Sequence, residues 1–213
     1  MFNFYVSAEN HHEHLLSYLN KGEMKQTFLN RKYKQILNIL PTRVNRSTYH
    51  VFTLPFQFVK LMLIGSELPD IKFDCVTELS IEEVVPFQNK FFVRISKCFP
   101  MLKHFSVSNS SSILSNQTTA DENISRDSII EYPHLISFDL FRTCTQIIDQ
   151  FLNENKTHLP RLGHLTIQYE DLRNVTQDFT REATRYNCAN VTKLTTYREM
   201  VGSKQFHLYF PLL

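Results

Sequence analysis

The sequence has little glycine and no tryptophan, with four glycines in 213 residues. Gly22, Gly65, Gly163 and Gly202 stand far apart, so no glycine-rich loop is available to hold a phosphate group. The Gly-x-Ser-x-Gly turn that presents a serine nucleophile is also absent. No other catalytic arrangement is visible, and we therefore expect a protein that is not an enzyme.

An excess of charge and a long apolar run are also missing. The chain carries 23 Lys and Arg against 21 Asp and Glu, and its longest basic run is Arg31-Lys32, so charge does not suggest a nucleic-acid partner. The longest apolar candidate, residues 59–65, contains Lys60 and is too short to span a membrane. The first residues lack the basic region of a signal peptide. We expect a cytoplasmic or nuclear protein with no membrane and no nucleic-acid partner.

Metal-binding patterns are weak. The four cysteines lie far apart and form no Cys-x-x-Cys pair, at Cys75, Cys98, Cys144 and Cys188. We expect them to be reduced thiols packed near the core. His11 and His14, with Glu13 beside them, could hold a metal on one helix face, but the sequence positions no further ligands. We expect neither a metal nor another cofactor.

A short apolar frame, Φ-x-x-Φ-x-Φ, recurs along the chain at spacings of 26 to 33 residues. Its copies are Val76-Leu79-Ile81, Leu102-Phe105-Val107, Leu135-Phe138-Leu140, Leu162-Leu165-Ile167 and Val191-Leu194, where Thr196 replaces the last apolar residue. The final Φ-x-Φ has the alternation of a strand, and a proline two residues before three of the copies favours an extended entry. A fixed frame at this period predicts a solenoid of stacked units.

Helical patterns lie between the copies. Residues 86–99 and 145–155 carry apolar side chains at helical spacing, and residues 170–187 carry a longer stripe of Leu172, Val175, Phe179 and Ala183. Residues 108–127 are rich in Ser, Asn and Thr and predict a flexible insertion, followed by a short helix near 125–132. We therefore expect an α/β solenoid over residues 71–213, with a parallel sheet on one face and helices on the other.

Residues 1–70 differ from this pattern. Two helices broken near Gly22 are predicted, the second with Ile36, Leu37 and Leu40 on its apolar face and Pro41 at its end. Residues 58–63 then fit the repeat frame again. We expect a mixed N-terminal cap or a degenerate first repeat.

The units resemble leucine-rich repeats, whose core is Leu-x-x-Leu-x-Leu. Residues 86–107, 128–140 and 159–194 are similar to the C-terminal leucine-rich region of an expanded set of invertebrate F-box proteins, and residues 175–191 form the most specific string. The resemblance covers roughly residues 76–194 and implies an irregular leucine-rich-repeat-like solenoid. It also implies the substrate-recognition part of an F-box type ubiquitin-ligase component.

Two features depart from that family. The Asn or Cys that forms a buried ladder in leucine-rich repeats is replaced at every copy, by Val84, Ser110, Thr143, Glu170 and Glu199. No F-box pattern occurs in residues 1–40. The cullin-ligase adaptor is therefore a partner only if an F-box lies outside this chain.

One surface remains as a candidate binding site. Polar residues alternate with the apolar strand residues and are expected to face outward on the concave side of the stack, here called the open face. They are Glu78, Ser80, Glu82, His104, Ser106, Ser108, Ser137, Asp139, Phe141, His164, Thr166, Gln168, Lys193, Thr195 and Tyr197. Phe141 and Tyr197 are possible aromatic anchors for an unknown protein partner. We predict a non-catalytic protein–protein interaction module.

Asparagine sequons leave one alternative open. Seven Asn-x-Ser/Thr sequences occur, at Asn45, Asn109, Asn116, Asn123, Asn155, Asn174 and Asn190. The composition alone gives about two by chance. They reflect either a chain rich in Asn, Ser and Thr or an extracellular, glycosylated leucine-rich-repeat recognition domain.

Overall fold

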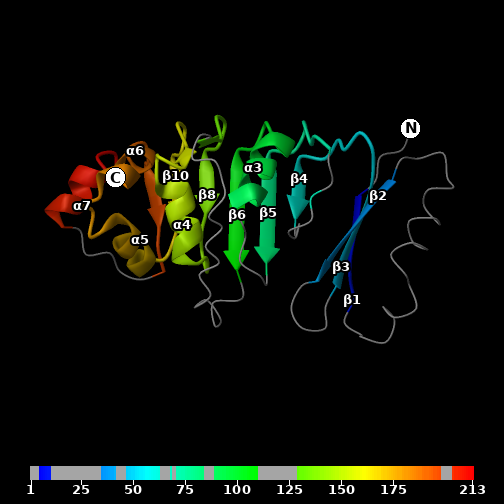
Figure 1. Cartoon of the computed structure of the whole chain (residues 1–213), viewed down its shortest axis with the longest axis horizontal. Coiled ribbons are helices and arrows are strands. Elements are labelled where there is room, and N and C mark those ends of the chain that lie inside the picture. The colour runs from blue at the N-terminus through cyan, green and yellow to red at the C-terminus, as the bar shows by residue number, and fades with distance from the viewer. Residues whose placement is uncertain are drawn as a thin grey trace.

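A six-stranded parallel sheet forms the centre of the fold (Figure 1). The computed structural model describes residues 5–10, 35–41, 47–62, 68, 71–83, 89–109, 129–197 and 203–213. The sheet contains β4 (Lys60–Met62), β5 (Glu78–Glu83), β6 (His104–Asn109), β8 (Ser137–Asp139), β10 (His164–Thr166) and β11 (Lys193–Thr195). These strands lie side by side in chain order, so each new strand is added at the same edge.

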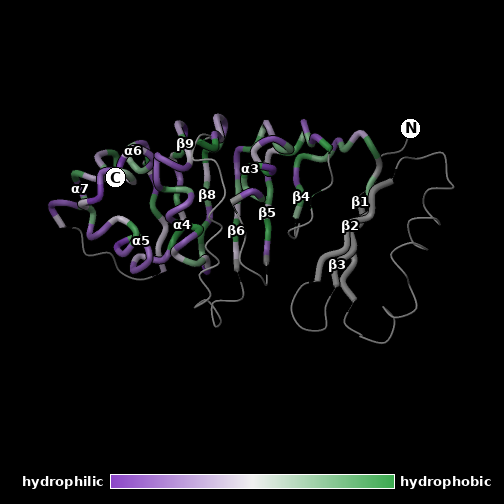
Figure 2. The backbone as a smooth tube through the Cα atoms, viewed as in Figure 1, coloured by the Kyte–Doolittle hydropathy of each residue, from purple (hydrophilic) through white to green (hydrophobic). Residues whose placement is uncertain are grey.

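The repeat frame determines the register of this sheet. Its second apolar residue is aligned across all six strands, as Leu61, Leu79, Phe105, Phe138, Leu165 and Leu194. The first five of these side chains are at most 2 % exposed. The predicted parallel α/β arrangement is thus confirmed, and hydrophobic and hydrophilic residues alternate along β5 (Figure 2).

The entry to each strand repeats one hydrogen-bonding device. The carbonyl of Val59 accepts the backbone N–H groups of Thr77 and Glu78, and the carbonyl of Thr77 accepts those of Lys103 and His104. The same double acceptance recurs at the carbonyls of Lys103, Ile136 and Gly163. Because backbone polar groups must be paired when buried, this device joins neighbouring copies before their strands begin. The Val59 carbonyl extends this device to β4. The repeated arrangement therefore begins before residue 71, where the sequence predicts the start of the solenoid.

Helices cover one face of the sheet (Figure 1). They are α3 (Asn89–Cys98), α4 (Thr145–Leu152), α5 (Tyr169–Thr176) and α6 (Glu182–Cys188), while α7 (Lys204–Tyr209) lies beyond the end of the sheet at β11. Phe151 of α4 lies at the centre of the core, with ring centroids 4.5 Å from Phe138 of β8 and 4.8 Å from Phe92 of α3. The helices predicted over residues 86–99 and 145–155 are confirmed by α3 and α4.

The single helix predicted over residues 170–187 is wrong, because two helices form there. Between α5 and α6, Gln177, Asp178 and Phe179 have φ angles of 52°, 54° and 64°, in the left-handed region that non-glycine residues seldom adopt. This turn brings Phe179 into the core, where its ring centroid lies 5.1 Å from that of Phe206 in α7. Burial of the Phe179 ring against α7 offsets the backbone cost.

The short helix predicted near 125–132 is also wrong in its described part. Ile130–Glu131 form β7, which pairs in parallel with β9 (Thr157–His158). The N–H groups of Ile130 and Tyr132 donate to the carbonyls of Lys156 and His158. Pairing with the next copy therefore replaces local helix formation. Residues 110–128, which include most of the predicted insertion, lie outside the described residues.

The N-terminal strands form a separate antiparallel sheet in the order β1-β3-β2. Its members are β1 (Tyr5–Asn10), β2 (Gln35–Pro41) and β3 (Ser47–Thr53). The predicted helix over Ile36, Leu37 and Leu40 is wrong, because β2 pairs residue by residue with β3. β3 is rich in aromatic and β-branched residues, which favour strand pairing over the weak helical pattern of β2. Residues 11–34, with the predicted first helix and the histidine cluster, lie outside the described residues.

Candidate functional site: the open face of the sheet

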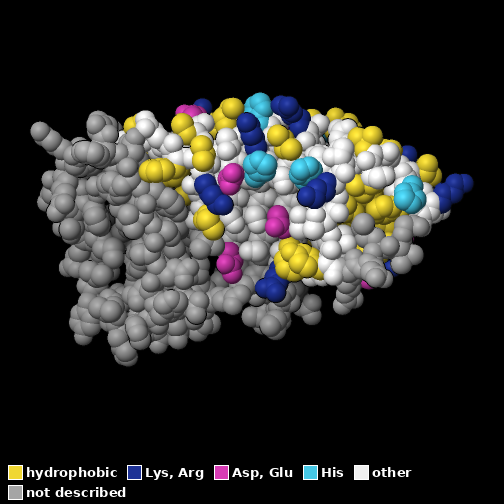
Figure 3. All heavy atoms as spheres, turned by 180° about the vertical axis from the view of Figure 1, so that it is seen from behind, with side chains coloured by type: hydrophobic (Ala, Val, Ile, Leu, Met, Phe, Trp, Pro, Cys, Tyr) yellow, Lys and Arg dark blue, Asp and Glu magenta, His cyan; other side chains and the backbone are white. Residues whose placement is uncertain are grey.

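The open face lies opposite the helices, and Figure 3 shows it from that side. All the residues predicted for it fall in the described part of the chain, and each is exposed or half-buried. They form rows across the strands, because the register aligns Glu78, His104, Ser137, His164 and Lys193, and two residues later Ser80, Ser106, Asp139, Thr166 and Thr195. Their role in binding stays a prediction.

A hollow of about 210 Å³ lies over β4, β5, β6 and β8. Ser80, Ser106 and Ser137 line it, and their short side chains leave the space between longer neighbours. Lys60 and Glu78 stand at one side and form an ion pair with an N–O distance of 3.4 Å. Met62, Leu79 and Phe105 also line it, so the hollow offers hydroxyl groups and charges beside apolar side chains.

An aromatic pair stands near the carboxyl ends of β8 and β11. The rings of Phe141 and Tyr197 are stacked with centroids 3.8 Å apart, and 62 % of Tyr197 is exposed. Asp139 holds the turn after β8 by accepting the N–H of Phe141 at 2.9 Å. The guanidinium of Arg142 lies 5.3 Å from the centre of the Phe141 ring. Stacked aromatic and arginine side chains of this kind supply much of the binding energy in protein interfaces.

Metal-ligand side chains and thiols are the other candidate groups among the described residues. None of them forms a group of three or more His, Cys, Asp or Glu side chains that could hold a metal ion. All four cysteines are free; Cys98 and Cys188 are buried, Cys144 is half-buried and Cys75 is exposed. Burial raises the pKa of the Cys188 thiol, which disfavours the thiolate. In the same part of the chain, no helix is both apolar enough and long enough to cross a bilayer.

A second hollow, of about 420 Å³, lies on the helical side and was not predicted. Asp149 of α4 stands in it, and its two carboxylate oxygens each accept a hydrogen bond at 2.5 Å, one from Lys156 and one from Arg181. Burial alone would raise the pKa of Asp149, but the hydrogen bonds and charges of Lys156 and Arg181 outweigh it and hold this pKa below its usual value. No spacing in the sequence signals this cluster, because Arg181 belongs to the next copy.

Asp149→Asn is expected to lower stability at pH 7 by about 1 kcal/mol. A carboxyl group with a lowered folded-state pKa contributes stability above its unfolded-state pKa and loses it as the pH falls through the folded-state value. The difference between the wild type and Asp149→Asn should therefore shrink below about pH 4. Urea denaturation over a pH series measures it. Asp178→Asn, which removes the carboxylate of the exposed pair with Arg173, is the control. If the stability difference between the wild type and Asp149→Asn does not change with pH, the prediction is contradicted.

Comparison with known proteins adds no relative: no family model, no curated protein and no solved structure matches the chain. The similarity to F-box proteins with leucine-rich repeats stays a prediction that rests on the residues quoted above.

Proposed function

We propose that this chain is a non-catalytic protein–protein interaction module and that the open face binds its partner. The observation that carries this proposal is the continuous, in-register surface of partly exposed polar side chains that ends in the Phe141–Tyr197 stack. A sheet face that only contacts water has no need of an aromatic pair in which 62 % of Tyr197 is exposed. Aromatic anchors beside polar groups are typical of protein interfaces.

We further propose that the chain is an irregular leucine-rich-repeat-like solenoid. Strands added in chain order, helices on one face and the double-acceptor carbonyl that links each strand to the next support this proposal. At one of the predicted ladder positions, the Thr143 hydroxyl is buried and donates to the carbonyl of Val107 at 2.7 Å. At another, Glu170 is exposed, which supports irregular rather than regular repeats.

The partner-binding role fits the substrate-recognition part of an F-box type ubiquitin-ligase component. Such a component needs an F-box to bind the cullin-ligase adaptor, and the pattern is missing from residues 1–40. A pull-down with purified adaptor tests this part of the proposal separately. Binding only when an upstream coding segment is included would support it, whereas no binding with any upstream segment would contradict it.

Tyr197→Ala is the direct test of the open face. We expect affinity purification of the tagged chain from cells to lose its specific partner, because truncation of an aromatic anchor in an interface costs about 2 kcal/mol or more of binding free energy. Tyr186→Ala, on α6, is the matched control, since 54 % of Tyr186 is exposed on the helical side. Both variants should melt like the wild type. If the two variants retain the same partners, the open face is not the binding site.

A further inference from the structure

Charge is distributed unevenly along the strands of the open face. Near the amino ends of β6 to β11 lie cationic and histidine side chains, here called the basic band: Lys103, His104, His164 and Lys193, with Arg161 in the turn before β10. Glu78 lies in the same row on β5, outside the band. Towards the carboxyl ends lie the carboxylates of Glu82 and Asp139. Figure 3 shows most of the Lys, Arg and His side chains of this face in its upper part, with Asp and Glu side chains beside them.

Among the described residues, no carboxylate forms an ion pair with the cations of the basic band. Lys60, at the edge of the sheet, is paired with Glu78. Within the described part of the chain, by contrast, Lys103, Arg161 and Lys193 form no ion pair, and all three are exposed. His164 is aligned directly beside Lys193 in the neighbouring strand. The ring N–H of His164 can donate a hydrogen bond to an anion, and the three cations Lys103, Arg161 and Lys193 add electrostatic attraction.

The dimensions of the band indicate the size of the anion. The band crosses β6, β8, β10 and β11, which are three strand spacings of about 4.8 Å each. An extended segment of about five residues covers that distance. Ser137, half-buried in the middle of the row, leaves room for such a segment between His104 and His164.

The surroundings favour a short acidic peptide over a long polyanion. Asp139 lies two residues beyond the row on β8, and Glu78 lies beside His104 on β5. These carboxylates would repel the continuous phosphate backbone of a nucleic acid or the headgroups of an anionic membrane. A segment of a few residues can follow the basic band without passing over them.

We infer that the basic band binds an extended, Asp- and Glu-rich segment of the partner protein. This inference rests on the proposed function and adds the chemistry of the partner to it. The acidic segment lies across the amino ends of β6 to β11, and the Phe141–Tyr197 pair remains available for an apolar side chain of the same partner.

Fluorescence anisotropy of the full chain with labelled peptides tests the inference. A peptide of alternating Glu and Ser should bind, and a peptide of alternating Lys and Ser should not. The double variant Lys103→Glu/Lys193→Glu should weaken the acidic peptide about tenfold. Binding should also weaken as added salt shortens the screening length below about 8 Å. Lys103→Gln/Lys193→Gln should give a smaller loss in the same direction.

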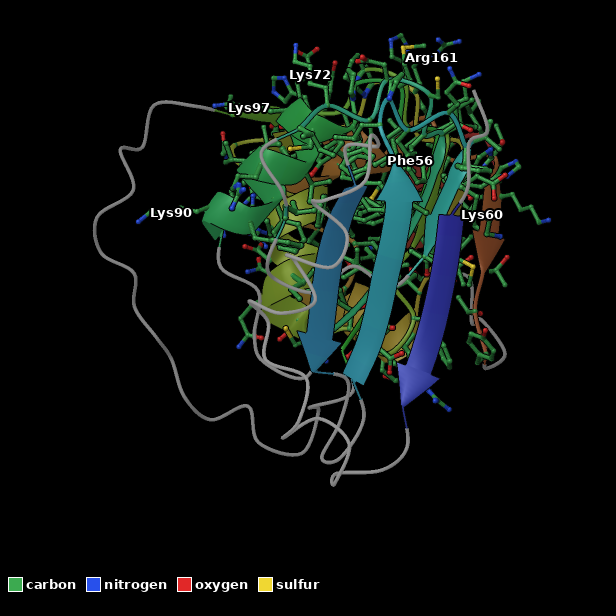
Figure 4. The ribbon with its side chains drawn as sticks, turned by 90° about the vertical axis from the view of Figure 1, so that its right-hand side faces the viewer. Phe56, Lys60, Lys72, Lys90, Lys97 and Arg161 are labelled. Atoms are coloured by element: carbon green, nitrogen blue, oxygen red, sulfur yellow. The ribbon has the colours of Figure 1, made fainter. Side chains whose placement is uncertain are left out.

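Lys90→Glu is the matched control, because Lys90 is an exposed lysine of α3 on the helical side (Figure 4). This variant should bind the acidic peptide as the wild type does. An equal loss with Lys90→Glu, no binding of the acidic peptide at low salt, or tighter binding of duplex DNA or phosphatidylserine vesicles through the same band would overturn the inference.

Partner capture from cells separates this inference from the proposed function. If Lys103→Glu/Lys193→Glu and Tyr197→Ala both lose the partner, both proposals stand. If the charge variant keeps a partner that Tyr197→Ala loses, the acidic segment is wrong and the interaction module stands. If neither variant loses a partner, the proposed function itself fails.

Discussion

Leu165→Asp is expected to abolish cooperative folding. Leu165 is 1 % exposed in β10, where Phe138 and Leu194 lie beside it in the register of the sheet. An unpaired carboxyl group at this position has no hydrogen-bonding partner among its apolar neighbours, and its burial costs several kcal/mol. A domain of this size is stable by about 5 to 15 kcal/mol, so most of that stability disappears. Thermal melting followed by circular dichroism should show no cooperative transition at the wild-type temperature.

His164→Ala, one residue earlier, is the control for this result. His164 is exposed on the open face, and its replacement should change the free energy of unfolding by less than about 0.5 kcal/mol. A wild-type melting curve for Leu165→Asp would contradict the buried position of this side chain. A large loss for His164→Ala would mean that β10 presents the opposite face to the core.

The strands of the sheet could be predicted because each is specified by a short pattern of consecutive residues. Each copy of the frame carries its own two inward residues, such as Phe105 and Val107, and the period of two in a strand then assigns every neighbour to one face. The same arithmetic identified which residues line the open face. Equivalent frames also align with each other, so the register followed once the strands were parallel.

Elements whose form depends on distant residues were not predictable. The apolar stripe through Leu172, Val175 and Phe179 predicts a helix that continues past Thr176, where α5 ends. The chain turns there instead, because Phe179 packs against Phe206 of α7, which is distant in the sequence. In the same way, β2 is a strand because β3 pairs with it. The spacing of apolar residues within one segment cannot predict either contact.

In the candidate site, too, the sequence predicts positions but not the contacts between distant side chains. Alternation places Phe141 and Tyr197 on the open face, but only the assembled sheet shows that their rings meet across β10. The Asp149 cluster joins two copies through Arg181 and leaves no trace in the spacing of residues. Contacts between side chains of neighbouring copies therefore cannot be predicted from the pattern of a single copy.

Asn187 is the clearest example of such a bridge. The sequence lacks the Asn or Cys of a regular leucine-rich-repeat ladder, and Asn187 lies in the region predicted as a plain helix. In the structure it is 1 % exposed and satisfies backbone groups of the preceding copy. Its Nδ2 donates to the carbonyls of Phe151, Leu152 and Thr157, and its Oδ1 accepts the N–H of Leu159 at 2.9 Å.

Asn187→Ala is therefore expected to lower the free energy of unfolding by about 3 to 5 kcal/mol. The substitution removes the amide that pairs two carbonyls at the end of α4, which have no partner further along that helix. It also leaves the Leu159 N–H and the Thr157 carbonyl buried without this partner. Each unsatisfied group costs about 1 to 3 kcal/mol, and relaxation of the chain recovers part of the sum. Urea denaturation measures the loss as a lower midpoint with an unchanged slope.

Asn190→Ala gives the matched comparison three residues later. Asn190 is exposed, and its Nδ2 donates only to the Pro160 carbonyl at 3.2 Å in the described part of the chain. Because water can replace an exposed amide, this variant should lose less than about 0.5 kcal/mol. Equal effects at positions 187 and 190 would show that the buried amide does not join the copies. A large loss confined to Asn187→Ala would establish that this single buried side chain joins the two neighbouring copies.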